Sequence, residues 1–542
     1  MLGLIRSNDV GGTTFRRSTR VHSAAIRLIA GIGCVAATAP ALAENWKLNA
    51  SAGASETYTS NANYSSSSLA EGDWVTSITG ALQIHGEGAR LKVNGSIAGS
   101  GTFYASQSQN NSFAPQVNLS GTLEAIEKFA YVEALATVSQ TFISPFGAQP
   151  ADIVNATQNR YTQQTYAVSP YIQGRLGSTD VSYQVRDDNY WTVASNYGDS
   201  SSGIPNTYSN SLSASMNSAA KQGSWSLTYN RFKYDSGITN ATDGGQGATT
   251  TQIARLIVTY QIDPQVQIAP RIGYERNDFP LRSTSDTVYG IGGQWNPGDR
   301  TQVGGFWEHR FFGSSYSANI AHRLPNAALS ANFSRGLSSY PQLALAIPAG
   351  ATLAQFLDAA FTTRIADPAE RAAAVAQFLA TSGLPPTLAS PVNFYAASVT
   401  LQQSASASLV LIGALNSLSF SIFDVQSEAI SGAGNVLPPA LQFGQNNTQT
   451  GGGVAFSHRL TAFTSLTANV TYSTTTADTT STVALAGNRS QNGSASLTVS
   501  TQFGPKTNGS AGVNYSRSRF PGDTNIGTSS ALNVFASVSH TF

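Results

Sequence analysis

The sequence has a single cysteine, few charged residues and few long apolar runs. Charged residues make up 11% of the chain, less than half of the roughly 25% that is usual in a soluble domain. The scarcity of long apolar runs argues against a helical membrane protein, in which each helix needs about 20 apolar residues. The formal net charge of +1 gives no reason to expect nucleic acid as a partner. This composition suits a β-barrel, whose strands alternate apolar and small polar residues.

The N-terminal residues have the features of a secretory signal peptide. A short apolar stretch, Leu28 to Thr38, precedes the small-residue cleavage site Ala41-Leu42-Ala43. The positive residues before it are Arg16, Arg17, Arg20 and Arg27. We therefore expect residues 1–43 to be removed on export and residues 44–542 to form the mature protein.

The one cysteine, Cys34, falls inside the expected signal peptide. The mature chain is therefore expected to have neither disulfides nor thiol chemistry. A lipoprotein signal at Cys34 is the alternative. It is disfavoured because Gly31-Ile32-Gly33 is a poor lipobox and the apolar run before it is short.

The last residues, 532–542, show the repeat of a half-buried strand. Apolar and polar side chains alternate from Leu532 to the terminal Phe542, and Phe535 is the one apolar exception on the polar face. The last strand of a membrane β-barrel commonly ends on an aromatic residue that lies in the girdle at the membrane interface. The pattern therefore predicts that similar strands fill the rest of the chain.

The same alternation recurs from Trp46 onward, for instance over 265–275, 465–472 and 494–500. We predict an all-β fold: a large antiparallel transmembrane β-barrel in the outer membrane, with about 22 strands, give or take two to four. A soluble β-sandwich or β-solenoid would explain the alternation alone. It would not explain the signal peptide, the alternating loop lengths and the terminal aromatic residue together.

Short turns and longer polar loops alternate along the chain, as in barrels with short periplasmic turns and long outer loops. The turns are rich in Gly, Pro, Asn and Asp. They are expected near 86–88, 127–128, 177–178, 221–222, 263–264, 296–299, 325–326, 413–414 and 504–505. The longer loops are expected around 59–73, 105–112, 142–160, 195–206, 236–248, 277–284, 429–445, 477–487 and 520–527. This order places both termini of the barrel on the periplasmic side.

One segment breaks the β pattern, inside the longest outer loop, residues 337–392. Apolar residues over 352–363 have helical spacing. Asp367-Pro368-Ala369-Glu370 then supplies an N-cap, a proline at the first helical position and a capping acid. Gly383 and Pro385 end this second helix. We expect a helical insertion in an extracellular loop, and interpret it either as a lid or plug over the lumen or as a folded external loop without gating.

Several stretches together resemble one known family over nearly the whole mature chain. They are Gly86-Glu87-Gly88-Ala89-Arg90-Leu91, Asn110-Asn111, the run Gly121 to Phe129, the run Gln140 to Gln149 and the run Asp367 to Val375. The most specific parts are Ser144-Pro145-Phe146-Gly147-Ala148-Gln149 and Asp367-Pro368-Ala369-Glu370-Arg371-Ala372-Ala373-Ala374-Val375. The chain is similar to the PEP-CTERM system-associated outer membrane β-barrel family. Members are encoded with exosortase-type sorting and exopolysaccharide clusters, so the resemblance implies a role in exporting or assembling exopolysaccharide, with periplasmic export proteins as partners.

The sequence contains no recognisable catalytic or metal-binding constellation, and we expect no cofactor. The histidines are His22, His85, His309, His322, His458 and His540, and none forms a ligand pair at helical or loop spacing. Phosphate-loop, EF-hand and dinucleotide motifs are absent. We expect no enzyme, although a Ser–His pair assembled in three dimensions stays open because serines are everywhere.

Two sets of charged residues are candidates for a function in a barrel. The first shares the polar, lumen-facing parity of its strands, where charges set ion selectivity or line a sugar path or, alternatively, pair across strands and stiffen the wall. Its members are Arg186, Asp188, Arg255, Arg271, Glu275, Glu308 and Arg310. The second follows an aromatic residue on the lipid-facing parity, where anionic lipopolysaccharide would meet it at the outer rim; the alternative is that these cations lie beyond the bilayer and are solvated. Its members are Arg231, Lys233, Arg276, Arg335, Arg517 and Arg519.

The sequence thus leaves three functional hypotheses. The first is a barrel that passes or helps to secrete exopolysaccharide. The second is a structural or assembly barrel with a closed lumen, and the third is a general diffusion porin. An open, charge-lined lumen would separate the first and third hypotheses from the second.

Overall fold

The computed structural model describes residues 45–542 with internal gaps. The gaps are 196–203, 219–222, 240–245, 280–281, 341, 343–352, 362–364, 366, 368–369, 373, 376–378, 380–387, 395, 397–398, 431–445, 478–488 and 522–526. The expected signal peptide, 1–43, lies outside the described residues. Within the described residues, no helix has the length and apolar character needed to cross a membrane.

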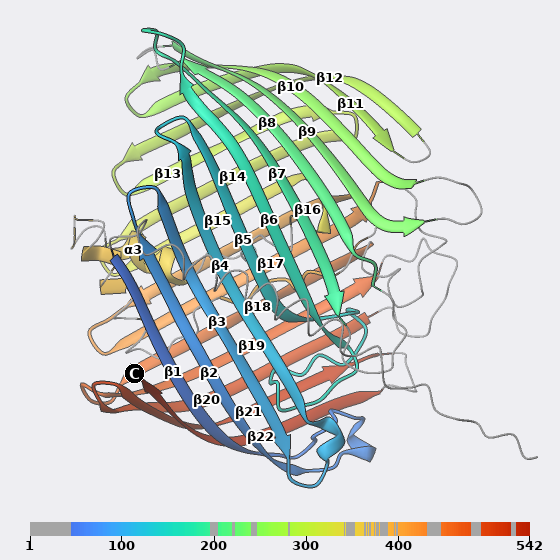
Figure 1. Cartoon of the computed structure of the whole chain (residues 1–542), viewed down its shortest axis with the longest axis vertical. Helices are drawn as coiled ribbons and strands as arrows, with labels where there is room; N and C mark the ends of the chain where they lie inside the picture. The colour runs from blue at the N-terminus through green and yellow to red at the C-terminus, as the bar shows by residue number, and fades with distance from the viewer. Residues whose placement is uncertain are drawn as a thin grey trace, which may run out of the picture.

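The chain forms a closed antiparallel sheet of 22 strands (Figure 1). Each strand pairs with its neighbours in sequence, and β1 also pairs with β22, from Ser51 opposite Thr541 to Thr59 opposite Asn533. The predicted transmembrane barrel and its strand number are therefore confirmed. Closure leaves no free edge, so the strands can satisfy their backbone N–H and C=O groups within a membrane.

Most strands are 12 to 18 residues long, enough to cross the apolar layer at the usual tilt. The first half comprises β1 Asn45–Thr59, β2 Asp73–Glu87, β3 Leu91–Tyr104, β4 Ser112–Ile126, β5 Ala130–Phe142, β6 Arg160–Arg175, β7 Val181–Ser195, β8 Thr207–Ser218, β9 Gly223–Thr239, β10 Gln246–Asp263 and β11 Val266–Phe279. The second half comprises β12 Arg282–Gly298, β13 Thr301–Arg310, β14 Gly313–Leu324, β15 Ala327–Ser338, β16 Thr400–Ile412, β17 Asn416–Ala429, β18 Asn447–Arg459, β19 Thr464–Ala477, β20 Arg489–Gly504, β21 Thr507–Arg519 and β22 Thr528–Thr541. Two short 3-10 helices, η1 Ser67–Leu69 and η2 Ser108–Asn110, lie in the connections after β1 and β3.

The two faces of the wall differ as the alternation predicts. Large apolar side chains are exposed on one face, for example Ile272, Val470 and Leu497. Their neighbours in sequence, such as Thr471 and Thr498, point to the other face and are partly covered. So much exposed apolar surface would be unstable in water but is matched to lipid. The face with the large apolar residues is therefore the membrane-facing exterior, and the other face lines the lumen.

The two ends of the barrel have different connections. At the end that holds Asn45 and Thr541, here called the terminal rim, strands are joined by short turns such as 264–265, 299–300 and 325–326. Two turns there use a positive φ, at Lys128 (55°) and Gly177 (55°). The opposite end, here called the loop rim, carries most of the longer connections, including 60–72, 143–159 and 339–399. The predicted alternation of short and long connections holds along most of the chain. Two connections at the loop rim are exceptions, because only residues 280–281 separate β11 from β12 and only residues 311–312 separate β13 from β14.

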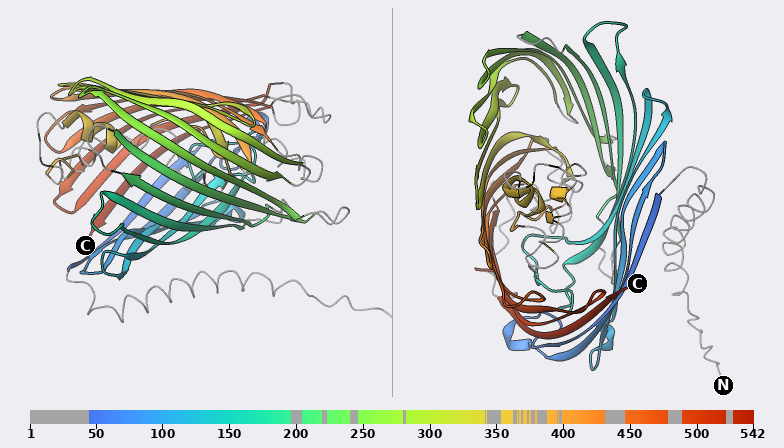
Figure 2. Two further views of the ribbon diagram at one scale, coloured as in Figure 1. Left: turned by 90° about the horizontal axis from the view of Figure 1, so that it is seen from above. Right: turned by 90° about the vertical axis from the view of Figure 1, so that its left-hand side faces the viewer.

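The helical insertion, expected in an extracellular loop, lies inside the barrel instead, which agrees with its interpretation as a plug and not with a folded external loop. Its ends leave from the loop rim, after β15 and before β16, but α3 (Leu353–Phe361) lies inside the lumen, close to the terminal rim (Figure 2). There Leu353 and Leu357 pack with Ala328, at the start of β15, and Val410, near the end of β16. Of the apolar face that the sequence predicts, Leu353 and Leu357 are buried, because apolar residues on the lumen side of the wall pack against them near the terminal rim.

The second expected helix is described only in part. Residues 370–372 and 374–375 are helical, and the Glu370 amide donates to the Asp367 side-chain oxygen at 2.9 Å. This bond is the N-cap that the sequence predicts. Val375 joins the same buried cluster as α3. The expected end of the helix, Gly383 and Pro385, lies outside the described residues.

The alternation of connections predicts which residues are reachable from outside the cell. We expect a peptide tag inserted at Asp243, between β9 and β10 and outside the described residues, to bind antibody on intact cells. A tag at Gly298, the last residue of β12 at the terminal rim, should bind antibody only after the outer membrane is permeabilised. Labelling of Gly298 with protection of Asp243 would show that the barrel is inserted the other way up.

The face assignment predicts how single arginines affect folding. Leu497→Arg or Val470→Arg should lower the free energy of unfolding by roughly 2–4 kcal/mol, because a cation at the lipid midplane is poorly solvated. Thr498→Arg, on the lumen face of the same strand as Leu497, should have a much smaller effect. A reversible folding assay into lipid vesicles measures this difference, and equal losses at Leu497 and Thr498 would refute the assignment.

Candidate functional site: an occupied lumen

A second connection, residues 143–159 between β5 and β6, also folds into the lumen (Figure 2). The Asn155 side-chain amide donates to Thr59 Oγ1 at 2.8 Å and to the Asn61 carbonyl at 3.0 Å. The Tyr104 hydroxyl donates to the Val154 carbonyl at 2.8 Å. The Asn533 side-chain amide of β22 also donates to Asn155 Oδ1 at 2.8 Å. These contacts fix the segment to the wall near β1, β3 and β22. The sequence predicts only a long outer loop here, and the position of this segment inside the barrel is not predicted.

The shape of this segment depends on Asn159. Its side chain accepts a hydrogen bond from the Ser144 amide at 2.9 Å and donates to the Ser144 carbonyl at 2.9 Å and the Ala148 carbonyl at 3.2 Å. Gly147 lies so close that an added Cβ would stand 2.3 Å from Asn159 Cγ. The run Ser144 to Gln149, one of the two most specific parts of the family resemblance, thus encodes a compact loop inside the lumen.

The long insertion is pinned to the wall at both of its ends. Near its start, Tyr340 hydrogen-bonds to Tyr161 and Gln163 of β6. Near its end, the Tyr234 hydroxyl donates to the Ala396 carbonyl at 2.7 Å. The Gln449 side chain both accepts from the Val392 amide (3.1 Å) and donates to the Val392 carbonyl (2.9 Å). The insertion is therefore held by paired polar contacts as well as by its apolar cluster.

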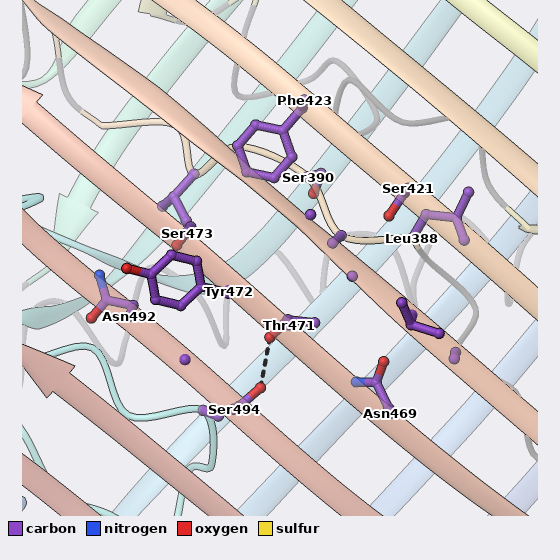
Figure 3. Close-up of a pocket in the computed structure, with 18 of the residues that line it drawn as sticks. Leu388, Ser390, Ser421, Phe423, Asn469, Thr471, Tyr472, Ser473, Asn492 and Ser494 are labelled. Atoms are coloured by element: carbon purple, nitrogen blue, oxygen red, sulfur yellow. Dashed lines mark hydrogen bonds between the residues drawn. The ribbon is translucent and has the colours of Figure 1, made fainter.

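The two infolded segments meet at a cavity of about 380 Å³. Residues 149–151 and 388–392 form one side of the cavity, and lumen-facing residues of β17, β18, β19 and β20 form the other (Figure 3). The residues that line the cavity include no Asp, Glu, Lys, Arg or His.

The predicted lumen charges lie on a different part of the wall, in two groups. In the first, Arg186 of β7 reaches across Tyr171 of β6 to Glu133 of β5, with 2.7 Å between Arg186 Nη2 and Glu133 Oε2. Its Nε also donates to Asp188 at 2.7 Å. Glu133 was not singled out from the sequence, because pairing between strands that are not neighbours leaves no local pattern.

The second group comprises the remaining five predicted residues, which form a cluster of three and a pair. Glu308 of β13 accepts from Arg255 of β10 at 2.7 Å and lies 3.8 Å from Arg271 of β11. Glu275 of β11 accepts from Arg310 of β13 at 2.8 Å. Both glutamates are almost completely buried, since Glu275 is 0% exposed and Glu308 is 1% exposed.

Glycines on β12, between these strands, make room for the long side chains. A Cβ at Gly292 would lie 2.5 Å from Arg271 Nη2, and one at Gly290 would lie 2.8 Å from Glu308 Cβ. Arg271 also stacks on the Phe306 ring, 4.3 Å from its centroid. All seven candidates therefore lie on the lumen side, and the geometry favours mutual pairing across strands over a ring of free charges.

The predicted rim cations lie on the exterior face, and several have protein partners. Arg231 donates to Asn210 at 3.1 Å, Arg276 lies 3.5 Å from Asp278, and Arg335 donates to the Ser314 carbonyl. Lys233, Arg517 and Arg519 are exposed. Arg489 of β20 is a further exposed cation that the sequence does not single out. It lies near Arg519, since Gln491, two residues further along β20, is the register partner of Arg519. Across the described residues, no three His, Cys, Asp or Glu side chains are placed to hold a metal ion.

The pairing of all strands and the apolar exterior define an outer-membrane β-barrel. No family model matches the sequence, and neither does any curated protein. Solved structures with a similar course of the chain include a mutant of the ferric enterobactin receptor from Pseudomonas aeruginosa (9% identity, 91% of this chain and 80% of that chain, TM-score 0.45). Others are the siderophore receptor PirA from Acinetobacter baumannii (8%, 92% and 80%, TM-score 0.43) and the ferric citrate transporter FecA (11%, 91% and 79%, TM-score 0.47).

The buried charge group makes a prediction about stability. Glu308→Gln should lower the free energy of unfolding by about 3 kcal/mol, because Arg255 and Arg271 would lose the carboxylate that both of them face. Glu87→Gln is the control, since its pair with Lys92 is exposed at the terminal rim and its loss should be undetectable. Denaturant titration of both variants in lipid vesicles measures the difference. Equal stability of Glu308→Gln and the wild type would show that the pairing contributes nothing.

Proposed function

We propose that this barrel takes part in the export of exopolysaccharide across the outer membrane, as a passage that is closed at rest. The observation that carries the proposal is the position of the two infolded segments. They hold the two most specific stretches of the family resemblance, and both lie in the lumen rather than on the cell surface. The described parts of the insertion and of 143–159 therefore lie where a passing polymer would meet them.

The apolar contacts of the insertion support closure at rest. Leu353, Leu357, Val375 and Leu388 are buried against the lumen wall, and each such side chain stabilises its position by roughly 1.5–3 kcal/mol. The four side chains together contribute at least about 6 kcal/mol. This exceeds the roughly 5.5 kcal/mol that moves a two-state equilibrium from 1:99 to 99:1. Opening therefore requires the binding energy of a partner. α3 lies near the terminal rim, where a periplasmic export protein would reach it.

Two alternative functions place different demands on the same lumen. A general diffusion porin needs a passage that is open without a partner, which the infolded segments disfavour. A structural or assembly barrel needs no passage at all and is compatible with the occupied lumen. The exposed cations at the loop rim are proposed contacts for the phosphates of lipopolysaccharide under any of the three functions. We propose no enzymatic activity.

Deletion of residues 345–388 tests whether the insertion closes the barrel. The variant should fold, because β15 and β16 pair along their full length without it, and should conduct more than the wild type in planar bilayers. Leu353→Asn with Leu357→Asn should raise the frequency of openings, because it weakens the same apolar cluster. Leu69→Asn, in an exposed connection, is the matched control and should conduct like the wild type.

The alternatives predict other results from the same recordings. A wild-type barrel that conducts as much as the deletion variant would be an open porin. A deletion variant that folds and still conducts no better than a closed wild type would identify the insertion as structural. Loss of polymer secretion in cells that carry the deletion, with normal amounts of barrel in the outer membrane, would support the export role.

A further inference from the structure

The cavity between the two infolded segments has a lining of a distinct chemical kind. Its wall side presents hydroxyl and amide groups from three strands, and Figure 3 shows them turned toward a common space; they are Ser421, Asn469, Thr471, Ser473, Asn492 and Ser494. The opposite side is formed by residues of 149–151 and 388–392, which are small or apolar except for Gln149 and Ser390. No Asp, Glu, Lys, Arg or His contributes to it.

Polar groups in this lining are left available for a ligand. Asn492 Oδ1 is buried and accepts no hydrogen bond from the described residues. Thr471 and Ser494 share one hydrogen bond of 2.7 Å, which leaves further acceptor capacity on each hydroxyl. A buried amide oxygen without a partner costs free energy, so a ligand hydroxyl that donates to it once the amide turns toward the cavity would be favoured.

The shape of the cavity is fixed by the wall around it. Gly453 lies against the returning segment, where an added Cβ would stand 2.9 Å from the Ala389 Cβ. The Gln449 clamp on Val392 holds the same segment at this distance. A volume of about 380 Å³ falls in the usual range of small-molecule sites, roughly 300–1,000 Å³. The space is therefore preformed rather than a chance gap between mobile chains.

We propose that this cavity binds a short uncharged segment of an oligosaccharide. Hydroxyl groups of a sugar both donate and accept, as do the serine, threonine and asparagine side chains that face them. An anionic sugar would lose hydration without gaining a cation, and a purely apolar ligand would leave the buried amides unpaired. The inference rests on the proposed export function for its biological meaning, and adds to it a neutral site within the passage.

Binding of neutral and anionic oligosaccharides to the purified full-length barrel in detergent tests the proposal. We expect maltohexaose or cellohexaose to give saturable binding by calorimetry or saturation-transfer NMR, and hexagalacturonate to give none. Asn492→Asp should weaken neutral-sugar binding about tenfold, because it replaces the amide with a charge that the cavity cannot pair. Asn514→Asp is the control: Asn514 faces the lumen from the neighbouring strand β21 but does not line the cavity.

The outcomes separate this inference from the function on which it rests. Absence of neutral-sugar binding, equal binding of hexagalacturonate, or equal loss in Asn492→Asp and Asn514→Asp would overturn the cavity assignment, even if the deletion of 345–388 abolishes secretion. The reverse outcome is also informative. If Asn492→Asp weakens neutral-sugar binding to the purified barrel, but cells that carry the deletion of 345–388 secrete normally, the cavity assignment stands and the export function is refuted. Thermal unfolding of both variants in detergent checks that each remains folded.

Discussion

Every other feature of this molecule depends on the pairing of β1 with β22. A strand at the edge of a sheet cannot remain unpaired in the apolar layer of a membrane, because water is not there to bond its N–H and C=O groups. The register from Ser51 opposite Thr541 to Thr59 opposite Asn533 removes both edges at once. It also fixes the number of strands, and the number of strands determines how much interior space the closed sheet encloses.

A barrel of this size has an interior that must be filled, hydrated or blocked. Plugged lumens are known for barrels of 22 strands. Here the filling comes from connections of the loop rim, 143–159 and 339–399, which are long enough to turn inward. The turns of the terminal rim are too short to do so. The lengths of the connections indicate which end of the barrel faces the periplasm. They thus also decide which segments can occupy the lumen.

The sequence predicts those parts of the structure that follow from local rules. Period-2 alternation and turn residues identify the strands, because each strand must present one face to lipid and one to the lumen. The Asp367 cap and the apolar face of 353–361 identify helical structure in the same local way, from residue types at helical spacing. What the sequence does not predict is long-range contact. Asn155 meets Asn533, and Arg255 meets Glu308 across two intervening strands; neither leaves a spacing that could be recognised in the chain.

The position of the insertion shows where local prediction stops. The apolar face of α3 indicates that Leu353 and Leu357 must be buried, but burial against a partner, a second helix or a wall would satisfy that demand equally well. The wall is chosen because the terminal ends of β15 and β16 carry Ala328, Val410 and Ile412 on the lumen side, where a water-filled channel would instead carry polar residues. These apolar lumen residues are visible in the sequence as exceptions to the alternation. An apolar residue on the lumen parity of a barrel strand therefore indicates that something packs against it from inside.

The lumen wall is divided by chemistry as well as by space. Described charges of β5, β7, β10, β11 and β13 are paired with one another, so they stiffen a curved part of the wall and leave little net field. The strands β17 to β20 carry hydroxyls, amides and glycines beside the infolded segments. A passage selective for ions would place unpaired charge where the lumen is narrowest. This barrel places neutral hydrogen-bonding groups beside the infolded segments, which is the arrangement expected for a ligand recognised by its hydroxyl groups and not by its charge.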